Sequence, residues 1–160
     1  MTRSLGPELP PDLVSRLSQS DLPAALGRAV PLVTVDATGR PHPMLCSYLE
    51  LLAADPAIIR LVIGKDSRSA RNLDERGAAT LLVIDAERTV YVKGRAGRRR
   101  FTVGALARFD LAVEEVLEDS PAEWETGIRI TGGIGYAPVP PLDAPWVQAT
   151  LAALRAERAP

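Results

Sequence analysis

The sequence predicts a mainly β fold, in which about six mostly antiparallel strands form a small closed or half-closed barrel with short helices at its periphery. Short apolar or alternating runs recur along the 160 residues and are separated by Gly, Pro and Asp. One short helix with clear end signals interrupts these runs after the third of them. At this length we expect a single domain, residues 1–160, with helices within 1–27 and a last helix within 138–160.

Two helices are expected before the first strand. Residues 10–17 begin with two prolines and then place apolar side chains at helical spacing. A second helix is expected from Ser20 or Asp21 to Gly27, a residue type that often ends helices. We expect both helices to cover one end of the barrel.

Three strands are expected in the first half of the barrel. Residues 30–35 form an extended apolar run, and the turn at 36–40 requires Gly39 at positive φ. The apolar run 44–52 follows as the second strand. Residues 58–64 form the third strand, which stops at a glycine.

The second half of the barrel is expected to begin with residues 78–84, a nearly continuous apolar run that favours a strand buried on both faces. Residues 89–96 alternate as a half-buried strand does, and 97–100 are expected to form a loop. The run 105–117 is expected to be extended, although its pattern also allows a helix for part of it. The side chains expected to face the core are Val90, Val92, Gly94, Ala96, Phe109, Leu111, Val113 and Leu117.

Four further elements are expected toward the C-terminus: a helical turn at 120–124, a last strand at 128–134, an extended link at 138–141 and a helix at 145–158. The apolar side chains of that helix are Trp146, Ala149, Leu151 and Leu154. The aromatic side chains of Trp124, Tyr136 and Trp146 are interpreted as packing residues.

The stretch from Leu61 to Leu73 carries the strongest local signal. A β-type run stops at Gly64, and Ser67 occupies the N-cap position of a short helix that ends near Gly77. Such a helix start has unpaired N–H groups and a partial positive charge, so it favours an anion. Further donors surround it: Lys65, Ser67, Arg68, Ser69 and Arg71. The pattern predicts a phosphate site, with an ordinary solvated helix start as the alternative.

Composition argues against several other classes of function. The 19 Lys and Arg residues balance 20 Asp and Glu residues to a net charge of -1, so we expect no nucleic-acid partner and no attraction to an anionic membrane. Cys46 and His42 are the only residues of their types, which excludes an intrachain disulfide and a structural zinc site. Cys46 is interpreted as a small buried hydrophobe and His42 as a turn-flanking residue. Without a leader-like or membrane-spanning run, the expected location is cytoplasmic.

A basic cluster surrounds the loop at 97–100. Its members are Lys93, Arg95, Arg98, Arg99 and Arg100. The cluster is interpreted as a solvated hairpin, with a second anion site as the first alternative and a nucleic-acid contact as the least favoured one.

Three segments carry a family resemblance in their order along the chain. Residues 34–43 read Thr-Val-Asp-Ala-Thr-Gly-Arg-Pro-His-Pro, residues 65–73 read Lys-Asp-Ser-Arg-Ser-Ala-Arg-Asn-Leu, and residues 92–96 read Val-Lys-Gly-Arg-Ala. Together they resemble the pyridoxamine 5′-phosphate oxidase-like superfamily of FMN-binding split barrels. The similarity covers about residues 26–135.

The resemblance implies a six-stranded antiparallel split β-barrel that forms a homodimer with FMN at the subunit interface. It implies phosphate contacts from Arg68 and Ser69, with Lys65, Ser67 and Arg71 beside them. The flavin ring would lie along the second and third strands, near Met44, Leu45, Cys46, Ser47, Val62 and Ile63. For Trp124, Tyr136 and Trp146, the alternative to a packing role is that one of them lies over the flavin at the dimer interface.

The chain also departs from the family pattern. True pyridoxamine phosphate oxidases carry basic residues where this chain has Pro43 and Tyr48, and many members have lysine at the position of Ser69. We therefore expect an FMN-binding oxidoreductase of unknown substrate rather than a pyridoxamine phosphate oxidase. The alternatives are a non-catalytic split barrel that binds flavin, haem or deazaflavin, and a cofactor-free interaction module. FAD fits the same phosphate site.

Overall fold

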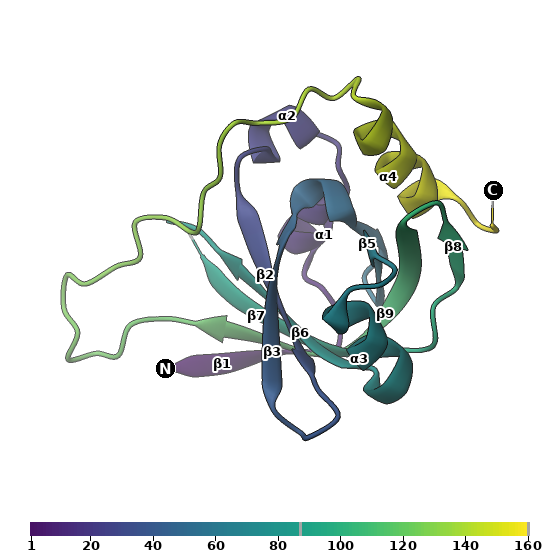
Figure 1. Cartoon of the computed structure of the whole chain (residues 1–160). Coiled ribbons are helices and arrows are strands. Elements are labelled where there is room, and N and C mark those ends of the chain that lie inside the picture. Colours follow the sequence, from purple (N-terminus) through teal and green to yellow (C-terminus); the bar gives the residue numbers. More distant parts are fainter. Residues whose placement is uncertain (87, 160) are drawn as a thin grey trace.

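The computed structural model describes residues 1–86 and 88–159, and within them one antiparallel sheet of nine strands curls into an open barrel (Figure 1). The strands are β1 Thr2–Gly6, β2 Ala29–Val35, β3 Pro41–Ser47, β4 Leu51–Asp55, β5 Ile58–Gly64, β6 Ala78–Ile84, β7 Thr89–Ala96, β8 Phe101–Val103 and β9 Leu106–Asp119. The helices are α1 Pro11–Leu17, α2 Leu22–Ala25, α3 Arg68–Arg76 and α4 Pro145–Arg155, and a 3-10 turn, η1, spans Tyr48–Glu50. The predicted fold class, a mainly β split barrel with short helices, is confirmed.

The order along the main sheet is β3-β2-β6-β7-β9-β5-β4, so β3 and β4 form its two edges. The short strands β1 and β8 both pair with β9 beside this path. Neither was expected, because five and three residues respectively are too few to show a clear period. They raise the strand number above the predicted six.

The hairpin of β2 and β3 forms as predicted. Its seven residue pairs run from Ala29 opposite Ser47 to Val35 opposite Pro41. In the turn, one carboxylate oxygen of Asp36 accepts hydrogen bonds from backbone N–H groups two and four residues later, at 2.8 and 3.0 Å. Gly39 has φ +82°, as expected.

The predicted single strand over 44–52 is wrong, because the chain turns at η1 between β3 and β4. Ser47 and Glu50 form a capping box around this turn, in which the Ser47 N–H donates to a Glu50 carboxylate oxygen at 2.6 Å. These local hydrogen bonds replace the ladder bonds that a continuous strand would need. The turn carries the chain from one edge of the sheet to the other.

Burial of β6 differs from the prediction. Ala79, Leu81 and Val83 are buried, whereas the residues between them are only half-buried. The strand therefore has one core face rather than two. Its partner β7 is buried at Val90, Val92, Gly94 and Ala96 as predicted.

Strand β9 is extended throughout and settles the ambiguity of the run at 105–117. Phe109, Leu111 and Val113 face the core as expected. The register with β7 then shifts by one residue, so Val116 is buried and the prediction for Leu117 is wrong. Gly94 lies beside this bulge, where a Cβ would approach the Ala112 carbonyl oxygen to 2.4 Å.

Residues 120–144, here called the arm, contain none of the expected regular strand at 128–134. The arm projects from the end of β9, then returns past α2 to α4 (Figure 1). It contacts the barrel through a bridge between Arg28 and Gly135, flanked by two backbone hydrogen bonds of 2.8 Å. Trp124 is 82% exposed and Trp146 57% exposed, so neither is the packing residue that was predicted.

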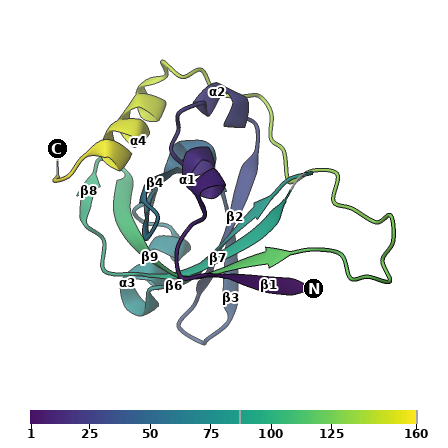
Figure 2. The same ribbon diagram turned by 180° about the vertical axis from the view of Figure 1, so that it is seen from behind.

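The helices at the chain ends cover the barrel. Figure 2 shows α1 over one opening, with α2 beside it. The last helix, α4, ends at Arg155 rather than Arg158, and it packs against β5, β9 and η1. Its buried residues are Val147, Thr150, Leu151, Ala153 and Leu154. Of the four side chains predicted to form its apolar face, Leu151 and Leu154 are buried, and Trp146 and Ala149 are not.

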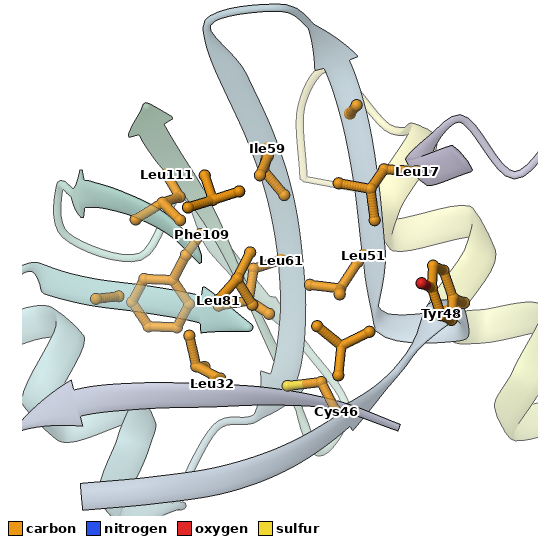
Figure 3. Close-up of a cluster of buried hydrophobic side chains, with 14 of the residues drawn as sticks. Leu17, Leu32, Cys46, Tyr48, Leu51, Ile59, Leu61, Leu81, Phe109 and Leu111 are labelled. Atoms are coloured by element: carbon orange, nitrogen blue, oxygen red, sulfur yellow. The ribbon is translucent and has the colours of Figure 1, made fainter. Parts of the chain in front are cut away.

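The core fills the barrel and centres on Phe109, whose side chain is fully buried (Figure 3). Around it lie Leu32, Leu61, Leu81 and Leu111, which come from four different strands (Figure 3). Burial of these side chains is the main stabilising term. In the described residues no helix is long and apolar enough to span a bilayer.

Candidate functional site

The connection from β5 to α3 forms the predicted helix start. The Ser67 N–H donates to the Gly64 carbonyl at 3.0 Å, and the Lys65 N–H donates to the Ala105 carbonyl at 2.9 Å. Ser67 has extended φ and ψ, and its hydroxyl accepts a hydrogen bond from the Ala70 N–H at 3.1 Å. Gly77 ends the helix at φ +74°. Both ends of α3 therefore match their sequence signals.

Cations and free donors gather at this helix start. Arg68 and Arg71 are exposed, and neither forms an ion pair with a described residue. The backbone N–H groups of Arg68 and Ser69 lie in the first turn, where a helix supplies no acceptor. Lys65 is half-buried next to them. The donor set suits a phosphate dianion.

Ser69 and Asn72 lie on the inner side of α3. The Ser69 side chain is 1% exposed, and its hydroxyl is buried without a partner among the described residues. Ser69 can therefore offer an outside anion its N–H but not its hydroxyl. The Asn72 amide donates to the Thr34 hydroxyl at 2.9 Å, and that hydroxyl donates to the His42 carbonyl at 3.3 Å. These bonds fix α3 against the β2–β3 hairpin.

Asp74 and Arg99 support the segment before the helix. The Arg99 Nε donates to the Asp74 carboxylate at 2.7 Å, and its Nη1 donates to the Lys65 carbonyl at 3.2 Å. The guanidinium also lies over the Phe109 ring, 5.9 Å from its centroid. Sequence reasoning missed this pair, because nothing local connects residues 25 positions apart.

The basic cluster is mostly neutralised. Lys93, Arg95 and Arg100 pair with glutamate or aspartate at 2.9, 3.4 and 3.5 Å, and Arg99 pairs with Asp74. This arrangement favours the solvated hairpin over the second anion site.

Replacing Asp74 with asparagine is expected to cost about 1 kcal/mol of unfolding free energy at pH 7, a value reduced for partial exposure. Desolvation raises the pKa of Asp74, but the hydrogen bonds and charge of Arg99 outweigh it, and the net pKa lies below the ordinary value of 3.8. A lowered pKa in the folded state stabilises above the unfolded pKa, and this stability is lost as pH falls through the folded pKa. Urea unfolding of parent and Asp74→Asn should therefore differ at pH 7 and converge on acidification below 3.8; a constant difference would contradict this account.

The residues predicted to carry a flavin ring lie on two strands. On the edge strand β3, Leu45 is 57% exposed, Met44 and Ser47 are half-buried and Cys46 is buried. On β5 both side chains are buried: Ile63 lies in the main core, and Val62 packs against α4. Pairing of β4 with β5 runs from Ile58 to Leu61. Val62 and Ile63 can therefore offer a ligand only backbone groups.

Cys46 is expected to react slowly with a disulfide reagent. Burial, and to a lesser degree the charge of Glu50, raises the pKa of the thiol well above its ordinary range. Labelling with dithionitrobenzoate should be at least about a hundred times slower in the folded protein than in urea-unfolded protein. Comparable rates in the two states would show that the thiol is accessible.

A pocket of about 420 Å³ opens at the Ser47 end of β3. It is lined by β3, η1, the returning arm and the start of α4, including Leu45, Leu49, Glu50, Tyr136 and Trp146. Burial raises the pKa of Glu50, against hydrogen bonds from Ser47 that lower it. Sequence reasoning did not single out Glu50, although Ser-x-x-Glu at 47–50 is a recognisable capping-box signal.

Comparison with known proteins identifies the family. A family model described as pyridoxamine 5′-phosphate oxidase matches residues 26–126. A structure from Lactobacillus delbrueckii, named as a candidate pyridoxamine 5′-phosphate oxidase, is 19% identical with a TM-score of 0.57 and covers 71% of this chain and 98% of that one. HupZ from Group A Streptococcus is 14% identical with a TM-score of 0.53, covering 81% and 100%. PhzG from Burkholderia lata, solved with tetrahydrophenazine-1-carboxylic acid, is 15% identical with a TM-score of 0.50, covering 69% and 80%.

No curated protein matches the sequence. The solved structures share the fold at low identity, whereas the family model covers most of the barrel and includes β2 through β9. The chain belongs to the pyridoxamine 5′-phosphate oxidase-like split-barrel superfamily.

Proposed function

We propose that this protein is an FMN-binding flavoprotein that works as an oxidoreductase on a substrate other than pyridoxamine phosphate. The start of α3 carries the proposal. It presents two backbone N–H groups, the exposed cations Arg68 and Arg71, and the half-buried Lys65. A phosphate there would gain from charge-assisted hydrogen bonds and from the helix dipole.

The flavin ring is proposed to lie along β3, toward Ser47. The hydrogen bonds from Asn72 through Thr34 connect α3 to the His42 end of β3. From His42 to Ser47 the strand extends about 16 Å, at roughly 3.3 Å per residue, which is comparable to the length of an extended flavin mononucleotide. The edge of β3 offers backbone donors and acceptors to the ring, and Ser67, Ser69, Met44 to Ser47, Val62 and Ile63 complete the proposed site.

Bound FMN would supply the redox chemistry, and the chain would contribute binding and orientation. The Asp74–Arg99 pair would hold the Lys65 segment in place. Pro43 on β3 and Tyr48 at the start of η1 provide no positive charge, which argues against a phosphorylated substrate bound as in pyridoxamine phosphate oxidases.

A homodimer with the cofactor at its interface is part of the proposal. Leu45 on β3 and Trp124, Ile128 and Ile130 on the arm are large apolar side chains exposed in the single chain. Large exposed apolar side chains favour association when a partner covers them in one interface. Sedimentation should give twice the chain mass of 17.1 kDa, and a monomer at micromolar concentration would contradict this part.

The function is tested by visible spectroscopy of the purified protein after FMN is added and free flavin is removed. Retained flavin bands that bleach with NADH or NADPH would support an oxidoreductase. Retained bands that neither donor reduces would favour a non-catalytic carrier, and failure to retain flavin would contradict the proposal. Parallel samples with FAD, deazaflavin and haem test the alternative cofactors.

A further inference from the structure

The pocket at the Ser47 end of β3 lies apart from the α3 helix start. Its lining comes from β2, from β3 and η1, from the arm and from the start of α4: Ala29, Leu45, Cys46, Ser47, Leu49, Glu50, Ile134, Gly135, Tyr136, Pro138, Pro140 and Trp146. None of the α3 cations contributes to it. The arm closes one side through two backbone hydrogen bonds, from the Ala29 N–H to the Ile134 carbonyl and from the Tyr136 N–H to the Gly27 carbonyl. The pocket is therefore built by long-range packing rather than by one loop.

Apolar side chains form most of the pocket surface, and Glu50 is its charged member. The Glu50 carboxylate accepts a hydrogen bond from the Ser47 N–H at 2.6 Å, and it forms no ion pair within residues 1–86 and 88–159. Tyr136 also lines the pocket, and its hydroxyl is buried without a partner in the described chain. A carboxylate in apolar surroundings is stabilised by a cation or a strong N–H donor.

We propose that this pocket binds a small organic molecule with an apolar body and a protonated nitrogen, which donates to the Glu50 carboxylate. Leu45, Leu49, Ile134 and Trp146 would enclose the apolar body. A volume of about 420 Å³ is within the range of small-molecule sites. The pocket borders the proposed flavin site and shares Leu45, Cys46 and Ser47 with it. The proposal requires that the pocket stays open beside a bound flavin, and it does not require flavin for binding of the amine.

Trp146 reports on the pocket directly. Because Trp124 is the other tryptophan of the chain, Trp124→Phe leaves Trp146 as the only one. This variant should show a saturable change in emission with phenethylammonium. Neutral 2-phenylethanol and anionic 3-phenylpropionate should bind at least about tenfold more weakly, because they lack the positive charge.

Glu50→Gln in the same background should weaken phenethylammonium binding at least about tenfold and leave 2-phenylethanol unchanged. Glutamine also serves in a capping box, so the turn should survive, and an unaltered unfolding midpoint would verify this. The matched control is Glu8→Gln, at an exposed glutamate that does not line the pocket.

Equal affinity for amine and alcohol, or no effect of Glu50→Gln, would overturn the proposal. Displacement of phenethylammonium by FMN would also overturn it, because the pocket would then belong to the flavin site. A change in Trp146 emission that depends on protein concentration and not on phenethylammonium would show that a second copy of the chain fills the pocket. This result would also overturn the proposal. Loss of FMN binding with amine binding intact would count against the flavin proposal only.

Discussion

Replacing Arg108 with methionine is expected to lower the free energy of unfolding by about 3 kcal/mol. The Arg108 side chain is 3% exposed. Its Nη1 donates to the carbonyls of Ala153, Leu154 and Ala156 at 3.0, 3.3 and 2.8 Å, which are acceptors at the end of α4. Its Nε and Nη2 donate to Asp110 at 2.9 and 2.7 Å. The substitution removes the donor from the Ala153 and Ala156 carbonyls, whereas the Leu154 carbonyl keeps a hydrogen bond from Arg60 and Asp110 keeps its ion pair with Arg100.

Thermal and urea unfolding measure this effect, which corresponds to a fall in Tm of roughly 6–12 °C for a domain of this size. Arg60→Met is the matched control. Arg60 also donates to two carbonyls near the end of α4, but its acidic partner Glu157 is 79% exposed, so its loss should cost no more than about 1 kcal/mol. Equal losses of unfolding free energy in Arg108→Met and Arg60→Met would show that the burial of Arg108 adds nothing to stability.

The double variant Arg68→Ala, Arg71→Ala is expected to raise the Kd for FMN at least about a hundredfold. Each hydrogen bond to a charged group contributes roughly 1.5–3 kcal/mol, and two such contacts would be lost. Both side chains are exposed and outside the core, so the fold should be retained. Fluorescence titration with FMN gives the Kd.

The control for this variant is Arg155→Ala, Arg158→Ala, which changes the net charge equally at exposed positions on the C-terminal segment. Its FMN affinity should match that of the parent. If both double variants weaken binding to the same extent, general electrostatic attraction rather than a phosphate site would explain the effect.

Local signals predicted the parts of the fold that local interactions determine. Ser67 and Gly77 mark the ends of α3 because an N-cap hydroxyl and a left-handed glycine act within one turn. Gly39 and Asp36 likewise define the β2–β3 turn. The alternation of β7 also predicted its buried face correctly.

Long-range packing decided the elements that were predicted wrongly. The apolar residues at 128–134 alternate as in a strand, but among the described residues the β-pairing there is limited to the isolated bridge of Gly135 with Arg28. The apolar run at 44–52 hides a turn, because Ser47 and Glu50 bond to each other instead of continuing the ladder. Where Trp124 and Trp146 lie depends on how the arm folds back, which no local pattern specifies.

The candidate site was predictable only where one segment forms it. Lys65, Ser67, Arg68, Ser69 and Arg71 share one helix start, so their proximity followed from sequence. The support from Asp74 and Arg99, the cover of Val62 by α4 and the pocket around Glu50 each join distant segments. The buried hydroxyl of Ser69 also depends on which side of α3 faces the hairpin.

The most direct test of the flavin proposal compares the affinity of the unmodified protein for FMN and for riboflavin, which lacks the phosphate. If the start of α3 holds the phosphate, FMN should bind at least about a hundredfold more tightly. Equal affinity for the two flavins, or no binding of either, would contradict the account.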